Sequence, residues 1–130
     1  MKMIGLFSEL EPTATASLES MKDARGRLPE SVVDGVVAYL RAGQVVSDSM
    51  ELVQDPWNVS IRIPGGSGLQ SDGTYAWRQD LWHYVKSYRV GLPDEFVERA
   101  RAGTESRELQ REHYDEAMKS RAMALRSGRS

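Results

Sequence analysis

Cysteine is absent from this chain of 130 residues, and histidine occurs only twice. Without cysteine there is no disulfide, no thiolate nucleophile and no cysteine-bound zinc, and the absence is typical of proteins in a reducing compartment. The two histidines, His83 and His113, lie too far apart in the sequence to form the closely spaced pair that helices use to bind metals. We therefore expect neither a metal nor a cofactor.

Long apolar stretches are also missing. The apolar patch within residues 1–9 is too short for the core of a secretory signal, and Glu9 and Glu11 interrupt it. No other stretch approaches the roughly 20 apolar residues of a membrane-spanning helix. These absences predict a cytoplasmic protein that does not bind membranes.

The charge balance argues against a general nucleic-acid-binding protein. The chain has 17 basic and 19 acidic side chains, which gives a formal net charge of −2, and general nucleic-acid binders are usually basic. Residues 1–100 have an acidic excess and residues 101–130 a slight basic excess, a distribution that suits self-association through the C-terminal segment. Because no Gly-x-Ser-x-Gly motif or other nucleophile–base pattern occurs, we expect no enzyme and no nucleic-acid partner.

Hydrophobic residues make up 40% of the chain, which is enough for one domain with its own core. The clearest helix is predicted over residues 29–42, because Pro29 suits the first helical position and apolar residues recur at helical spacing. Gly43 is expected to end this helix in the left-handed conformation. The apolar face comprises Val33, Val36, Val37 and Leu40.

Alternating apolar and polar residues predict one strand. Val59, Ile61 and Ile63 are separated by Ser60 and Arg62, which is the period of two expected when one face of a sheet is buried. Residues 44–54 contain too few apolar positions to decide between a strand and a short helix. We therefore expect the Val59 strand to be part of the sheet, and the structure of residues 44–54 stays open between the two.

The dipeptide Asp72-Gly73 predicts a hairpin. It separates two short segments of strand character, and in a two-residue turn both residues would have positive φ. Tyr75 and Trp77 then share one face, opposite Ala76. We expect the face with the two large aromatic side chains to be the core.

Helices are predicted over residues 79–88, 92–103 and 104–126. The second helix begins with Leu92-Pro93-Asp94, as the first predicted helix begins with Leu28-Pro29-Glu30, which we interpret as shared capping chemistry. The last helix has only a thin apolar stripe, so we expect it to be stabilised by packing, with a second copy of the chain as one partner.

The glycine loop that follows Pro64 invites comparison with phosphate-binding loops, because glycine amides can bind oxyanions. The Lys-Ser/Thr pair of such loops is missing, and a strand follows where a helix would be needed. A flexible connection is the favoured interpretation, and anion binding is the alternative. The loop comprises Gly65, Gly66, Ser67 and Gly68.

All three tryptophans lie between residues 57 and 88. Most aromatic side chains there are expected in the core, but Trp57 and Trp82 can instead be exposed beside arginine, a combination that often anchors protein interfaces. His83 is expected on the solvated face of its helix, paired at most with Asp80. The predicted interaction surface comprises Trp57, Arg62, Arg78, Trp82, His83 and Arg89.

Residues 71–88 read Ser-Asp-Gly-Thr-Tyr-Ala-Trp-Arg-Gln-Asp-Leu-Trp-His-Tyr-Val-Lys-Ser-Tyr, and Leu-Pro-Asp-Glu-Phe follows at 92–96. This resembles a pattern of small uncharacterised actinobacterial proteins, T-D-G-x-W-x-W-[PR]-x-x-L-x-Y-Y-V, which is similar to stretches in immunity factors of polymorphic toxin systems. Tyr75 and His83 depart from it. Because the pattern consists mostly of structural aromatic residues, the resemblance implies a fold and a toxin-neutralising role, but no catalytic residues.

The sequence thus predicts an α+β domain over residues 1–103, with a short antiparallel sheet built from the Val59 strand and the hairpin, and a C-terminal helical extension over residues 104–130. We expect a non-enzymatic, protein-binding, immunity-like function, with a basic toxin domain as a partner that complements the acidic body. Homo-oligomerisation through the C-terminal helix is a second expectation. The alternative is a homo-oligomeric protein that binds a small molecule or anion at the glycine loop.

Overall fold

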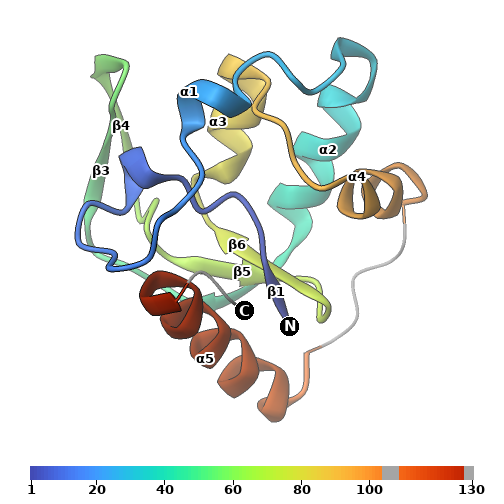
Figure 1. The fold of residues 1–130 in the computed structure, drawn as a ribbon. Helices are drawn as coiled ribbons and strands as arrows, with labels where there is room; N and C mark the ends of the chain where they lie inside the picture. The colour runs from blue at the N-terminus through green and yellow to red at the C-terminus, as the bar shows by residue number, and fades with distance from the viewer. Residues whose placement is uncertain (104–108, 128–130) are drawn as a thin grey trace.

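The structure, a computed structural model, describes residues 1–103 and 109–127. It confirms the α+β class: helices and a four-stranded sheet form the body, and a separate two-stranded arm projects from it (Figure 1). The helical elements are η1 (Ser8–Leu10), α1 (Met21–Ala24), α2 (Glu30–Ala42), α3 (Leu81–Tyr88), α4 (Asp94–Arg101) and α5 (Arg111–Ser127). The strands are β1 (Lys2–Met3), β2 (Gln44–Ser47), β3 (Leu52–Asp55), β4 (Asn58–Pro64), β5 (Leu69–Ser71) and β6 (Tyr75–Arg78).

The main sheet has the strand order β1-β6-β5-β2. β5 and β6 form the predicted hairpin, β2 pairs with β5 in antiparallel fashion, and β1 pairs with β6 in parallel. The prediction that the Val59 strand belongs to the same sheet is wrong. That strand is β4, and within the described residues its partner is β3, with which it makes the two-stranded arm.

Helices cover both faces of the main sheet: α2, α3 and α4 lie on one face and α5 lies on the other (Figure 1). Alternation along β6 explains the two layers, because Tyr75 and Trp77 belong to the large core cluster on the first face, whereas Ala76 packs with Leu69 and Ala117 on the second. The prediction that Tyr75 and Trp77 face the core is confirmed, since both are buried.

The turn of the β5–β6 hairpin differs from the prediction. Gly73 has a φ of 96°, but Asp72 is not among the described residues with positive φ. Asp72 acts through its carboxylate instead: Oδ1 accepts hydrogen bonds from the amides of Thr74 and Tyr75. Its Oδ2 accepts from the hydroxyl of Tyr39 and the guanidinium of Arg99, which ties the turn to α2 and α4.

The arm is less buried than the alternation of β4 predicts. Ile61 and Ile63 are half-buried, but Val59 is 71% exposed. The reason is that β4 lies in a two-stranded sheet outside the helical layers. The period of two correctly indicates a strand, but no layer of the core covers the whole apolar face of that strand. Leu52 and Met50, at and before the start of β3, are also exposed.

α2 and α3 end at the residues predicted from the sequence, but the left-handed backbone conformation predicted after α2 follows α3 instead. Gly43, after α2, has a φ of −59°, so the predicted left-handed ending is wrong. A Cβ atom at Gly43 would overlap the ring of Trp77, so glycine serves a close approach there. It is Arg89, after α3, that adopts the left-handed conformation, with a φ of 49° and a ψ of 48°.

The C-terminal helix belongs to the same domain as the sheet. α5 buries Ala117, Ser120 and Ala124 against the second sheet face, and Arg121 donates to the carbonyl of Ser67 at 3.0 Å. The division into a domain and an extension at residue 103 therefore has no counterpart in the packing. Of the helix predicted over residues 104–126, residues 104–108 lie outside the described residues, residues 109–110 are not helical, and α5 covers the rest. No helix in the described part of the chain is long and apolar enough to cross a membrane.

Candidate functional site

Two chain segments, residues 24–28 after α1 and residues 88–91 at the end of α3, run side by side and support the candidate site. At Gly91 they are so close that a Cβ atom would lie 2.9 Å from Cβ of Arg27, which explains a glycine at this position. We refer to them as the paired segments. Three backbone hydrogen bonds join them, from the amide of Gly26 to the carbonyl of Tyr88, from Leu28 to Arg89 and from Gly91 to Ala24.

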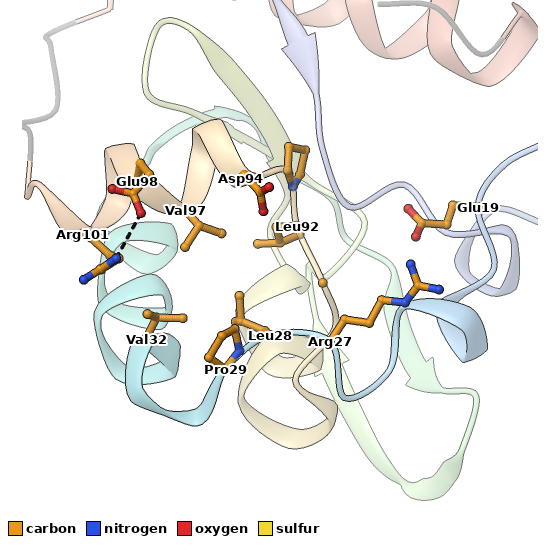
Figure 2. Close-up of a pocket in the computed structure, with 12 residues that line it drawn as sticks. Glu19, Arg27, Leu28, Pro29, Val32, Leu92, Asp94, Val97, Glu98 and Arg101 are labelled. Atoms are coloured by element: carbon orange, nitrogen blue, oxygen red, sulfur yellow. Dashed lines mark hydrogen bonds and ion pairs between the residues drawn. The ribbon is translucent and has the colours of Figure 1, made fainter.

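A groove of about 710 Å³ lies beside the paired segments (Figure 2). Its volume is within the range of ligand-binding clefts. Pro29 and Pro93 precede α2 and α4 with almost the same backbone angles, φ −60° and ψ 139° against φ −54° and ψ 137°, and each is preceded by a leucine of the groove floor. The apolar lining comprises Leu28, Pro29, Val32, Leu92, Pro93 and Val97.

Charged side chains flank this apolar floor at both ends (Figure 2). Arg101 donates to Oε1 of Glu98 at 3.0 Å at one end, and Arg27 and Glu19 lie at the other. Asp94 also lines the groove. The described residues that line it include no serine, threonine, cysteine, histidine or lysine. The groove therefore offers apolar contact and ion pairing, without a nucleophilic hydroxyl, thiol or imidazole.

Arg25, in the first of the paired segments, covers two aromatic rings. Its guanidinium carbon lies 5.1 Å from the ring centroid of Trp57 and 5.2 Å from that of Tyr88, and the two rings meet edge to face at 4.8 Å. Cations over aromatic faces are attracted by the ring quadrupole. Because Trp57 lies in the turn between β3 and β4, this stack joins the arm to the end of α3.

A buried carboxylate lies beneath the stack. Asp55 accepts hydrogen bonds from Tyr88 at 2.6 Å, from Nε2 of His83 at 2.8 Å and from the amide of Trp57 at 2.8 Å. Burial tends to raise the pKa of Asp55, but these three bonds outweigh it and lower that pKa. Burial and the neighbouring carboxylate raise the pKa of Tyr88 to about 12. The carboxylate is therefore ionised and the phenol neutral near pH 7, and together they fasten the arm to α3.

The predicted interaction surface is only partly a surface. Trp57 and Arg89 come together at the end of α3, and both are half-buried. Trp82 lies on the first turn of the same helix, half-buried under the guanidinium of Arg41, whose Cζ is 4.4 Å from its ring centroid. Arg62 is exposed on the arm. No direct ring or cation contact links Trp82 with Trp57 within the described residues, because Trp82 is covered by Arg41 and Trp57 by Arg25.

Arg78 and His83 are buried, so their prediction as surface residues is wrong. Arg78 is 3% exposed, forms a two-pronged contact with Asp80 and also pairs with Glu11 at 2.7 Å. The guanidinium of Arg78 thus binds the carboxylate of Asp80, which helical spacing had predicted to pair with His83. Burial alone would lower the pKa of Arg78, but these carboxylates raise it.

His83 is 7% exposed and bonded to Asp55, a residue of the arm and not of its own helix. Ser87 approaches Nδ1 of the same ring at 3.4 Å, so serine, histidine and aspartate are aligned. None of the three lines the groove, and the serine contact is long for a hydroxyl hydrogen bond. The alignment serves to position the arm.

The glycine loop is closed on itself. The amides of Gly65, Gly66 and Gly68 donate to backbone carbonyls, and the hydroxyl of Ser67 contacts the carboxylate of Glu51 at 3.0 Å. Amides that are already paired, beside a carboxylate, are a poor cradle for an anion. The loop glycines instead allow close packing, since a Cβ at Gly66 would lie 3.0 Å from the side chain of Asp80.

No group of three or more metal-binding side chains occurs within the described residues. No family model matches the sequence, and the comparisons with curated proteins and with solved structures find none that is significantly similar. What the chain does must therefore be inferred from its own geometry.

Sequence reasoning missed the groove and the role of Arg25. The sequence contained one indication of the groove. The two Leu-Pro pairs that precede α2 and α4, which were interpreted as capping chemistry, both line the same cavity. No such signal existed for Arg25, because its partners Trp57 and Tyr88 are distant in the sequence.

Proposed function

We propose that this protein is a non-enzymatic binding protein whose groove receives apolar side chains of another protein. The observation that carries the proposal is the composition of the groove, an apolar floor of leucine, proline and valine with charged groups at both ends. Protein interfaces combine an apolar centre with a polar rim in the same way.

Preorganisation of the groove supports the proposal. The floor residues Leu28 and Leu92 are attached to the paired segments, which three backbone hydrogen bonds already join. A partner would therefore meet a formed surface and lose little binding free energy to ordering the site. The acidic carboxylates and the guanidinium groups at the rim would fix its orientation rather than supply most of the affinity.

Neutralisation of a toxin is the form of this function that the sequence resemblance suggests. Such a protein acts by occupying a surface of its target, and a preformed groove suits that role. On this proposal the outward face of α5, with Met118 and Met123 exposed, remains available for a second copy of the chain. The helix does not need that copy for burial, because its small residues pack on the sheet of its own chain.

Site-specific crosslinking tests the proposal. A photoreactive phenylalanine derivative would replace Val97 in the groove and, as a matched control, Met118 on the opposite side of the sheet. After irradiation in native host extract, we expect a discrete crosslink to a different protein from the groove position, whereas the control should give at most a crosslink between two copies of this chain. Mass spectrometry identifies that protein.

Binding to the purified partner then decides the matter. Val97→Glu on the floor should weaken binding about tenfold or more, as losses at interface centres do. Arg101→Glu on the rim should weaken binding less, mainly by slowing association, and Met118→Glu should leave binding unchanged. Circular dichroism checks that each variant is folded. Equal crosslinking at both positions, or unchanged affinity in both groove variants, would rule the groove out as the binding site.

A further inference from the structure

Five cations lie in the paired segments or two residues before them, where the end of α1 meets the end of α3, and we call them the cationic patch. The paired segments bring them together, since Arg25 and Arg27 lie in one segment and Arg89 in the other. Four of the five are exposed, and Arg89 is half-buried. The patch comprises Lys22, Arg25, Arg27, Lys86 and Arg89.

We propose that the cationic patch binds an acidic segment of a partner protein. Within the described residues, no carboxylate forms an ion pair with any of its five cations, whereas Arg78 pairs with two carboxylates and Arg99 and Arg101 each pair with one. The inference goes beyond the proposed function, because the patch can be occupied while the groove is empty. Arg27 alone lines both sites.

The carboxylates near the patch do not cancel it. Glu9 is engaged, because it accepts hydrogen bonds from the amides of Met21 and Lys22 at the start of α1. Glu19 and Asp23 are exposed beside the patch. With the buried Asp55 included, five cations face four carboxylates, of which only Glu19 and Asp23 are exposed, so this end keeps a small positive excess in a chain whose formal net charge is −2. The local field is therefore opposite in sign to the average, and it would steer an acidic partner to this end.

The side chains of the patch are suited to a protein partner. Arg25 is held over Trp57 and Tyr88, so its planar donors are oriented before binding and can meet a carboxylate in two-pronged fashion. Arginine, tryptophan and tyrosine are the residues that dominate protein interfaces. Val59, 71% exposed at the start of β4, adds an apolar contact beside the charged groups.

A nucleic acid fits the patch less well. Single strands bind through free aromatic faces on which bases stack, but the ring of Trp57 is covered by Arg25 and meets the edge of Tyr88. A long run of phosphates would also encounter Glu19, Asp23 and the acidic remainder of the body. An acidic protein segment concentrates its charge within the width of the patch and avoids them.

Fluorescence anisotropy with defined probes tests this inference. The probes are a labelled peptide of glutamate and leucine, its twin with lysine for glutamate, and a labelled oligothymidylate. We expect the full chain to bind the glutamate peptide at low salt, to bind it less tightly as salt screens the charges, and to bind the other two probes more weakly. The double variant Lys22→Glu/Lys86→Glu should reduce affinity for the glutamate peptide about tenfold.

The matched control is Arg111→Glu/Lys119→Glu on α5, which changes the net charge by the same amount on exposed residues of the other helical layer. It should bind the glutamate peptide like the wild type. If both double variants lost the same affinity for the glutamate peptide, the loss would come from the change in net charge alone, and the inference would be overturned. So would absence of binding at low salt, or tighter binding of the oligothymidylate that depends on Lys22 and Lys86. Because neither double variant alters the groove, these outcomes are independent of the crosslinking result.

Discussion

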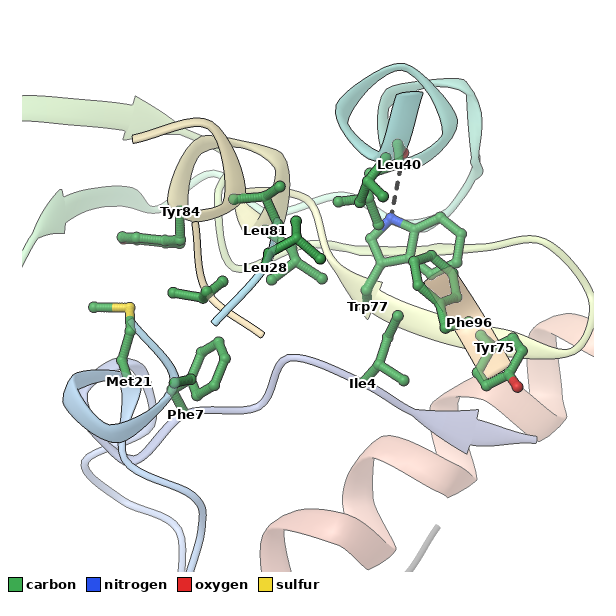
Figure 3. Packing of buried hydrophobic residues seen from close by; sticks show 14 of the residues in the cluster. Ile4, Phe7, Met21, Leu28, Leu40, Tyr75, Trp77, Leu81, Tyr84 and Phe96 are labelled. Atoms are coloured by element: carbon green, nitrogen blue, oxygen red, sulfur yellow. Dashed lines mark hydrogen bonds between the residues drawn. The ribbon is translucent and has the colours of Figure 1, made fainter. Parts of the chain in front are cut away.

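Gly35 lies within α2 and Gly43 directly follows it, yet alanine substitutions at the two positions should change the stability of the protein in opposite directions. A Cβ atom at Gly35 would meet nothing within 4 Å, whereas one at Gly43 would overlap the ring of Trp77, whose indole donates to the carbonyl of Leu40 at 3.3 Å (Figure 3). Gly35→Ala should stabilise the protein by about 0.5–1 kcal/mol through helix propensity. Gly43→Ala should destabilise it by about 1–3 kcal/mol through overpacking.

Urea unfolding of the two glycine variants and the wild type checks this prediction. Both variants add one methyl group, so the sign of the change separates helix propensity from packing. If Gly43→Ala were as stable as Gly35→Ala, the close approach of Trp77 to α2 would be disproved.

Glu9 predicts a pH dependence. Burial tends to raise its pKa, but hydrogen bonds from the amides of Met21 and Lys22 outweigh burial and lower the pKa from the ordinary 4.5 to about 2. A carboxyl group with a lowered folded-state pKa contributes stability that is complete above the unfolded pKa and is lost as pH falls towards the folded value. The contribution of Glu9 is thus present at pH 7 and disappears between about pH 4.5 and pH 2.

Thermal unfolding of wild type and Glu9→Gln across this pH range measures the effect. The variant should melt at a lower temperature at pH 7, and the gap should close on acidification. Glu19→Gln is the control and should follow the wild type, because this site is exposed and its carboxylate makes no hydrogen bond within the described residues. A gap that stays constant from pH 7 to pH 2 would mean that ionised Glu9 does not hold α1.

At the scale of elements, the carboxylate of Asp55 and the stack of Arg25, Trp57 and Tyr88 fasten the arm of β3 and β4 to α3. Asp55→Ala would leave the donors of Trp57, His83 and Tyr88 without their acceptor in a buried place, at a cost of about 3 kcal/mol or more. We expect hydrogen exchange to accelerate at residues 52–64 while residues 69–78 stay protected.

Gln54→Ala is the neighbouring control, because Gln54 is exposed and its amide contacts only the carbonyl of Val59 within the arm. It should leave exchange in both regions near wild-type rates. Uniform acceleration of the arm and the main sheet in Asp55→Ala would show that the two form a single cooperative unit, contrary to the prediction.

Elements that depend on local periodicity were predictable, and their surroundings were not. The spacing of valines in α2 and the turn chemistry of Asp72-Gly73 identify a helix and a hairpin, because both are determined by neighbours in the sequence. The environment of His83 depends on Asp55, which belongs to another element. Helical spacing offered Asp80 as its partner, but Arg78 takes that carboxylate with two hydrogen bonds. The prediction that His83 and Arg78 lie on the surface was wrong because their partners could not be identified from helical spacing.

At the scale of the whole molecule, α5 closes the second face of the sheet with a stripe of small residues. Ala117→Leu should force this helix away from Leu69 and Ala76 and cost about 1–3 kcal/mol. Ala122→Leu, exposed on the same helix, should change the free energy of unfolding by less than about 0.5 kcal/mol. Chemical denaturation provides the measurement. Equal stability of the two variants would contradict the placement of α5 as a layer of the domain.

The parallel pairing of β1 with β6 also sets an order of events during synthesis. Lys2 lies beside Tyr75, and α5 contacts β1 from still later in the chain. Chains emerge from the ribosome at only about 5–20 residues per second, N-terminal end first. The earliest strand therefore waits without its neighbour until the middle of the chain has been released, and the face that it shares with α5 stays uncovered longer. Completion of this sheet therefore has to follow the release of β6 and α5, and chaperones have their opportunity to act on the nascent chain before that step.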